Sequence, residues 1–164
     1  MKYEIVRELT VGFKNTRKKI LTGECVFNPE DSFKLAKKLQ QTWHNEIATC
    51  LFFDIKNKLI GFRHVGVGTN KLCVVNTRDL ILSAVGCNAA GVVFYHNHPS
   101  GNLEPSKEDD RMAGVLSMLC GLHDIELLDV LIISEDSFYS YMAQGSLSNI
   151  KNNAKTMLNG LGEV

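Results

Sequence analysis

Residues 91–101 read GVVFYHNHPSG, an apolar run that leads directly into two histidines, a proline and a glycine. The apolar half is typical of a short central strand, and Pro99 ends it because proline cannot donate to a sheet ladder. Side chains two positions apart on a strand point to one face, so His96 and His98 project together while Asn97 faces the opposite way. The segment therefore predicts a strand that brings two imidazoles to one point at its end.

The residues that follow predict a helix over 106–121, with Ser106 as its N-cap. Ser106 and Asp109 together resemble a capping box, which by itself is a common structural device. Asp109 lies seven residues before Leu116 and therefore on the buried side of the helix, and the helix N-terminus favours its ionised form. The expected buried stripe consists of Met112, Val115, Leu116 and Leu119.

Two histidines and one aspartate form a set of three ligands that can hold one zinc ion with a fourth position open. Structural zinc sites normally use four ligands, often cysteines, whereas an open position is typical of hydrolytic zinc. Such chemistry also needs a general base that is not a ligand. Glu46, directly before the apolar run 47–54, is the preferred candidate for that base, and Glu104 and Glu108 are the alternatives.

The remaining chain predicts alternating strands and helices. A hairpin is expected over 3–13 and 20–27, a helix with a stripe to Trp43 begins after Asn28, and a helix over 76–85 is capped by Asn76. A buried strand over 47–54 should pair antiparallel with 59–67, and two final strands are expected over 125–133 and 137–142. After Gly145 the chain is polar, so Leu147, Ile150 and Leu158 predict a weak helix that is loosely held or docks on a partner.

Bulk composition limits the function classes. The 164 residues carry 18 basic and 18 acidic side chains, so their balance lacks the basic field that broad nucleic-acid binding needs. Five cysteines form no C-x-x-C pair and are expected to be free thiols in a reducing cytoplasm. The N-terminus shows no signal peptide, and no apolar run approaches the roughly 20 residues of a membrane span.

The order Glu46, His96-x-His98, seven residues, Ser106, two residues, Asp109 resembles the JAMM (MPN+) metallohydrolase signature. The segment HNHPSGN followed by PSxxD is similar to the RadC family of bacterial JAB-domain proteins, and so are NTRD at 76–79 and NAA at 88–90. The resemblance covers about residues 42–143. It predicts a core domain there, with a hairpin and helix at 1–41 packed on the same domain and a polar tail at 144–164.

The resemblance implies an α/β fold of the JAB/MPN type, a cytidine-deaminase-like mixed β-sheet flanked by helices. It implies zinc held by His96, His98 and Asp109, Glu46 as the general base, and Ser106 as a hydroxyl donor to the developing oxyanion. Two features depart from the family. Its usual N-terminal helix-hairpin-helix domain is not recognisable here, and Val130 stands after Asp129 where the family tends to have histidine.

These observations favour a zinc-dependent metallopeptidase or isopeptidase, in which water activated by zinc and Glu46 attacks an amide carbonyl of a peptide or protein substrate. Two alternatives remain: a DNA-repair-associated protein, in line with the RadC family's name, and a non-catalytic binding module with a structural metal. A zinc deaminase of bases is disfavoured because the Pro-Cys-x-x-Cys ligands of those enzymes do not occur in the sequence.

Overall fold

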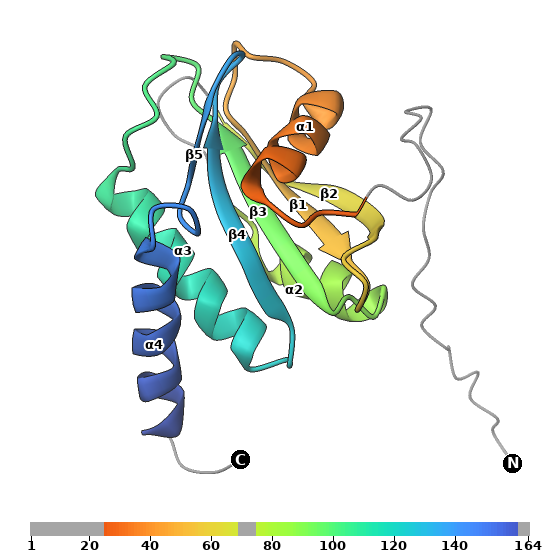
Figure 1. Ribbon diagram of the computed structural model, residues 1–164, viewed down its shortest axis with the longest axis vertical. Coiled ribbons are helices and arrows are strands. Elements are labelled where there is room, and N and C mark those ends of the chain that lie inside the picture. The colour runs from red at the N-terminus through yellow and green to blue at the C-terminus, as the bar shows by residue number, and fades with distance from the viewer. Residues whose placement is uncertain (1–24, 69–74, 161–164) are drawn as a thin grey trace, which may run out of the picture.

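The apolar runs of the chain form one five-stranded sheet, shown with its helices in Figure 1. The computed structural model describes residues 25–68 and 75–160. Its strands are β1 Ile47–Phe53, β2 Leu59–Val67, β3 Gly91–Asn97, β4 Glu126–Ile133 and β5 Phe138–Ser140. Its helices are α1 Pro29–Leu39, α2 Thr77–Gly86, α3 Lys107–Gly121 and α4 Ser146–Asn159. This mixed α/β architecture confirms the predicted fold class.

The sheet is mixed because it contains one parallel pair of neighbouring strands among antiparallel ones. The strand order is β2-β1-β3-β4-β5, and only β3 and β4 run parallel. The connection from β3 to β4 passes through α3, as a parallel pair requires, whereas the short connection between β1 and β2 gives the predicted antiparallel pair. The histidine-bearing strand β3 is central, as expected.

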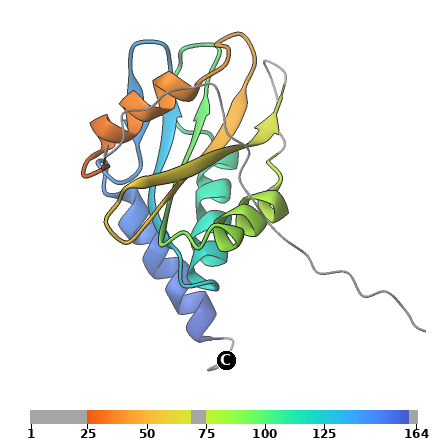
Figure 2. The ribbon, with the colours of Figure 1, turned by 90° about the vertical axis from the view of Figure 1, so that its right-hand side faces the viewer.

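Both faces of the sheet are covered, which explains why β1 and β3 are buried along their whole length. Alternate residues of β1 enter two separate cores: Cys50 and Phe52 pack toward α2 and α3, and Leu51 and Phe53 pack toward α1. Figure 2 shows α1 on one side of the sheet and α2 and α3 on the other. The predicted doubly buried strand is confirmed.

Three helices begin at polar caps that the sequence marks. The side chains of Asn28, Asn76 and Ser106 each accept a hydrogen bond from the backbone N–H three residues later. These bonds satisfy amides that have no partner inside the helix and fix where each helix starts. The cap at Ser106 matters most for the site, because it sets the position of Asp109 relative to β3.

The C-terminal segment is an ordered helix rather than the weak or loosely held one that its polarity predicts. Leu147 and Ala154 of α4 are buried, and Leu147 belongs to the core between the sheet and α3. A side chain added at Gly121 of α3 would meet Leu158 at 3.2 Å, so the two helices approach closely there. The few apolar residues of α4 are therefore enough to hold it, because Gly121 lets the two helices come close together.

The other differences between the predicted and the observed helices are smaller. α1 ends at Leu39, so Trp43 lies beyond it. The buried positions of α3 are Ala113, Leu116, Ser117 and Cys120, one step around from most of the predicted stripe. Among the described cysteines, Cys50 and Cys120 are buried and free. The expected strand over 3–13 and most of the one over 20–27 lie outside the described residues, as does Cys73.

Within residues 25–68 and 75–160, no helix combines the length and the apolarity needed to cross a membrane.

Candidate metal centre

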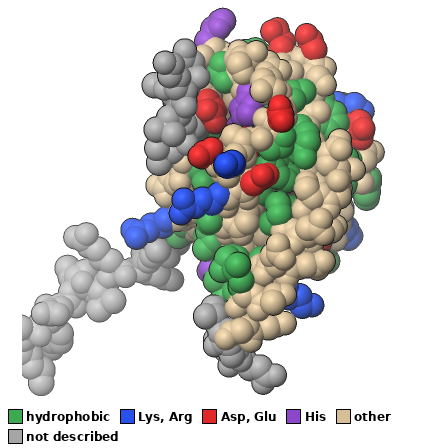
Figure 3. Space-filling model, turned by 90° about the vertical axis from the view of Figure 1, so that its left-hand side faces the viewer, with side chains coloured by type: hydrophobic (Ala, Val, Ile, Leu, Met, Phe, Trp, Pro, Cys, Tyr) green, Lys and Arg blue, Asp and Glu red, His purple; other side chains and the backbone are tan. Residues whose placement is uncertain are grey.

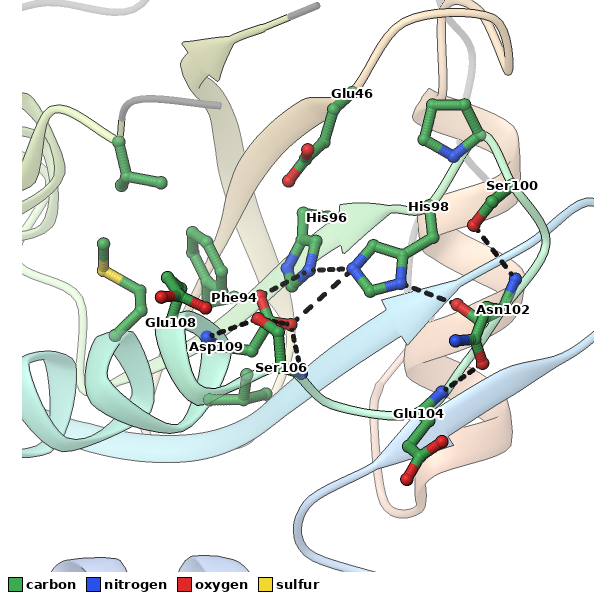
Figure 4. A pocket seen from close by; sticks show the side chains of 14 residues that line it. Glu46, Phe94, His96, His98, Ser100, Asn102, Glu104, Ser106, Glu108 and Asp109 are labelled. Atoms are coloured by element: carbon green, nitrogen blue, oxygen red, sulfur yellow. Dashed lines mark hydrogen bonds and ion pairs between the residues drawn. The ribbon is translucent and has the colours of Figure 1, made fainter. Parts of the chain in front are cut away.

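The centre lies where β3 ends and α3 begins. His96 is on β3, His98 follows that strand, and the backbone N–H of His98 still donates to the carbonyl of Ile133 at 3.0 Å, which holds it against β4. The chain then reverses through Gly101, whose φ of +76° is a left-handed conformation that glycine adopts without strain. This reversal returns the chain so that Asp109, in the first turn of α3, faces the two histidines (Figure 4).

One atom each from His96, His98 and Asp109 lies within 4.8 Å of the others, the arrangement of a metal-ligand set. The two Nε2 atoms are 3.0 Å apart. Asp109 Oδ1 lies 3.0 Å from His96 Nε2, and Asp109 Oδ2 lies 3.7 Å from His98 Nε2. The structure therefore brings together the three residues that the sequence predicts as ligands.

The hydrogen bond made by Nδ1 of His98 shows that its other ring nitrogen, Nε2, is free to bind a metal ion. Its Nδ1 lies 2.6 Å from the backbone carbonyl of Asn102, which can only accept, so Nδ1 carries a proton. In the neutral ring Nε2 then has a lone pair directed at His96 and Asp109. Such a hydrogen bond to the outer nitrogen is the usual support of a metal-bound histidine. Asn102 was not predicted, because the contact uses a backbone atom that any residue possesses.

Asp109 is held as an anion by its neighbours. Its Oδ2 accepts from the Ser106 hydroxyl at 2.7 Å and from the Ser106 backbone N–H at 2.8 Å. Burial alone would raise the pKa of Asp109, but hydrogen bonding and charge from His96, together with the two Ser106 donors, hold this pKa well below its usual range. In this arrangement Ser106 caps the helix and orients the carboxylate at once.

Glu46 is distant in sequence from the three ligands but lines the same cavity. It directly precedes β1, is half-buried, and points its carboxylate toward His96 and His98 in Figure 4. Burial raises the pKa of Glu46, the nearby charges of His96 and His98 lower it, and Asp109 raises it, with a net upward shift. A half-buried carboxylate with a raised pKa beside a ligand set is suited to general-base chemistry.

The two alternative glutamates also line the cavity but lie differently. Glu104 is in the turn before α3 and Glu108 is in its first turn, and both side chains are exposed. Figure 4 shows them on opposite sides of the ligand cluster, while Glu46 lies over it. The placement favours Glu46 as the base and leaves the other two on the rim.

Asn97, which the strand pattern turns away from the ligands, holds the segment that carries Glu46. Its Oδ1 accepts from the Ile47 N–H at 2.8 Å and from Gln40 Nε2 at 2.7 Å, and its Nδ2 donates to the Asn45 carbonyl at 3.0 Å. The two residues that flank Glu46 are thus tied to one fully buried amide. The sequence shows Asn97 only as a polar residue between two histidines, and it does not reveal this role because the hydrogen-bond partners of Asn97 lie about 50 positions away.

The site opens into a cavity of about 560 Å³. Figure 3 shows histidine atoms on this face with acidic side chains around them and apolar surface beside them. The cavity wall includes Val130, which is buried and pairs with Phe94 across β3 and β4. Val130 stands where the family tends to have histidine, so the lining of the cavity has an apolar side chain at this position.

A mixed sheet whose central strand ends in His-x-His, followed by a helix that returns a serine and an aspartate to the same point, defines the JAB/MPN class of domains. The model of the RadC-like JAB domain matches residues 26–146. The chain belongs to this family.

Curated relatives support that membership. The chain is 33% identical over 141 residues to a UPF0758 protein of Aquifex aeolicus, covering 85% of this chain and 58% of the relative. It is 31% identical over 139 residues to a UPF0758 protein of Protochlamydia amoebophila, covering 85% and 60%, and 30% identical over 139 residues to one of Thioalkalivibrio sulfidiphilus, covering 85% and 62%. The match thus spans about three fifths of these relatives' length.

Proposed function

We propose that this domain is a zinc-dependent hydrolase of amide bonds, a metallopeptidase or isopeptidase of the JAMM type. The observation that carries the proposal is the convergence of His96, His98 and Asp109, with the carboxylate of Glu46 directed at them from β1. Family membership supports the fold and the class of site, and the ligand set together with Glu46 supports the chemistry.

The residues fit zinc. Two imidazole nitrogens and one carboxylate oxygen are a usual zinc donor set with a position left open. The hydrogen bond from His98 Nδ1 to the Asn102 carbonyl leaves Nε2 free to bind, and Ser106 keeps Asp109 ionised and oriented. When bound, zinc supplies a Lewis acid for the amide carbonyl and lowers the pKa of water to about 7.

The protein's own groups then handle the protons. Glu46 accepts a proton from the attacking water and delivers it to the departing amine, a task that the rise in its pKa caused by burial favours. The Ser106 hydroxyl donates its single proton to Asp109 in this structure and would turn that proton toward the developing oxyanion, while the Ser106 backbone N–H continues to hold Asp109 Oδ2. Asn97 keeps the base in place by binding both of its neighbours along the chain.

Elemental analysis and peptide hydrolysis test this proposal together. Wild-type protein should contain about one zinc per chain, and a His96→Ala, His98→Ala variant should contain none. His44→Ala is the matched control, because His44 is exposed and lies outside the ligand set. Absence of zinc from the wild type, even after reconstitution, would refute the proposal.

Glu46→Gln should keep zinc and lose peptide hydrolysis by about 100-fold or more, as expected for removal of a general base. Glu104→Gln removes the same charge from the rim of the same cavity and should retain most of the activity. Equal activity of wild type and Glu46→Gln would contradict the assigned role. Bound zinc that raises the melting temperature while no peptide is cleaved would instead indicate a structural metal.

A further inference from the structure

We propose that the cavity binds a lysine or arginine side chain of the substrate, with its aliphatic part on an apolar wall and its charge at Glu108. This inference rests on the proposed hydrolase function and names the substrate class for it. It follows from three features of the cavity: an apolar wall, a carboxylate beside that wall, and the absence of lining cations among the described residues.

The wall is formed where the main core reaches the surface. Val75 and Met112 are partly buried, pack against this core and supply the accessible part of the wall, whereas Phe94 and Val130 of neighbouring strands are each only 1% exposed. All four line the cavity next to the ligands. A surface of this kind binds the hydrocarbon stem of a long side chain, which lysine and arginine bury while keeping their charged ends in water.

Glu108 provides the charge at the end of that wall. It precedes Met112 by four residues on α3 and so lies on the same helix face, and Figure 4 places it on the Phe94 side of the ligand cluster. A carboxylate in the first turn of a helix also interacts favourably with the helix dipole, but that interaction does not require the side chain to line the cavity. Lys107 and Arg111 of the same helix do not line the cavity.

The charges of the described lining residues favour a cationic over an anionic ligand. The carboxylates of Asp109 and Glu46 would offset the two positive charges of a zinc ion, so Glu104 and Glu108 leave the rim negative. Lysine and arginine are absent from the cavity lining among the described residues. A phosphodiester would meet this field at close range, which argues against nucleic acid as the ligand here.

Glu104 provides an internal comparison. It lies on the opposite side of the ligands from Glu108, and its backbone N–H donates to Asn102 Oδ1 at 3.0 Å. Removing its charge also removes one negative charge from the rim of the same cavity, but at a place away from the proposed side-chain site. The pair Glu108→Gln and Glu104→Gln separates a specific contact from long-range electrostatics.

The first experiment measures binding without turnover. N-acetyl-lysine methylamide and N-acetyl-norleucine methylamide, which differ in the terminal ammonium, are titrated into the metal-free protein and followed through backbone amide shifts. The lysine compound should bind roughly fivefold more tightly, the size expected of a solvent-accessible charge contact. The preference should disappear in Glu108→Gln and persist in Glu104→Gln.

The second experiment uses zinc-loaded protein and peptide pairs with lysine or norleucine on either side of the scissile bond. A lysine preference that Glu108→Gln abolishes supports the inference. Cleavage that depends on Glu46 but shows no lysine preference overturns the inference and leaves the proposed function intact. A lysine preference in binding without any cleavage overturns the hydrolase proposal instead. Equal binding of the two amides, or no binding of either, overturns the inference.

Discussion

Asn97 offers the sharpest test of how the fold positions the candidate base. Substitution by alanine removes the amide that accepts from Ile47 and Gln40 and donates to Asn45. A buried hydrogen bond contributes about 1 kcal/mol net, and its loss leaves polar partners unsatisfied. Three such bonds give an expected loss of about 3 kcal/mol in the free energy of unfolding, measured by urea denaturation.

The same substitution should affect catalysis through Glu46 and leave the ligands in place. The residues on either side of Glu46 lose their common anchor, and misplacement of a catalytic group by about 1 Å can cost on the order of 100-fold in rate. Zinc content should stay near that of the wild type, because His98 is held independently by Ile133 and Asn102. The predicted result is a zinc-loaded, folded and largely inactive protein.

Asn45→Ala is the matched control. It removes an exposed amide side chain directly before Glu46, while the Asn45 backbone carbonyl that receives the hydrogen bond remains. This variant should retain both stability and activity. If Asn97→Ala unfolds at the wild-type urea concentration, or loses no more activity than Asn45→Ala, the positioning argument is wrong.

Three further predictions concern the surrounding structure. Ser106→Ala should lower stability by about 1 kcal/mol through loss of the helix cap and weaken zinc binding about 10-fold or more by freeing Asp109, as measured by denaturation and by competitive zinc titration. Burial raises the pKa of Asp129, so the folded chain binds the proton of this carboxyl group more tightly than the unfolded chain does. The free energy of unfolding of the wild type should therefore fall as the pH rises from about 3.9 upward. Asp129→Asn should flatten this dependence in thermal melts recorded across the pH range. Leu147→Ala should destabilise the protein by about 3 kcal/mol in urea, whereas Met157→Ala, on the exposed side of α4, should change little. A pH-independent wild type or an unaffected Leu147→Ala would count against the respective argument.

The sequence predicted the elements that have a strong local signal. Asn76 and Ser106 mark helix starts through their own side chains, the apolar run at 47–54 identified a doubly buried strand, and the run at 91–95 identified a short central strand. The convergence of His96, His98 and Asp109 was also predictable, because strand periodicity and one helix start determine most of it. Glu46 was placed correctly near the ligands through its position before β1.

What the sequence did not predict depends on contacts between distant segments. α4 was underestimated because its stability comes from the surface of α3 around Gly121, which the composition of α4 does not reveal. The stripe of α3 was misplaced because that helix is covered by the sheet on one side and by α4 on another. The role of Asn97 was missed for the same reason, since its partners lie at the C-cap of α1 and at the start of β1.

The spacing of the site along the chain has a consequence for how the protein matures. The three ligands lie within a span of 14 residues, from His96 to Asp109, whereas Glu46 precedes His96 by 50 residues. Closing the short loop costs less conformational entropy than bringing β1 beside β3. Under the proposed function, a nascent chain should therefore be able to bind zinc at this segment before β1 docks, and the docking of β1 would be the step that brings Glu46 to the metal.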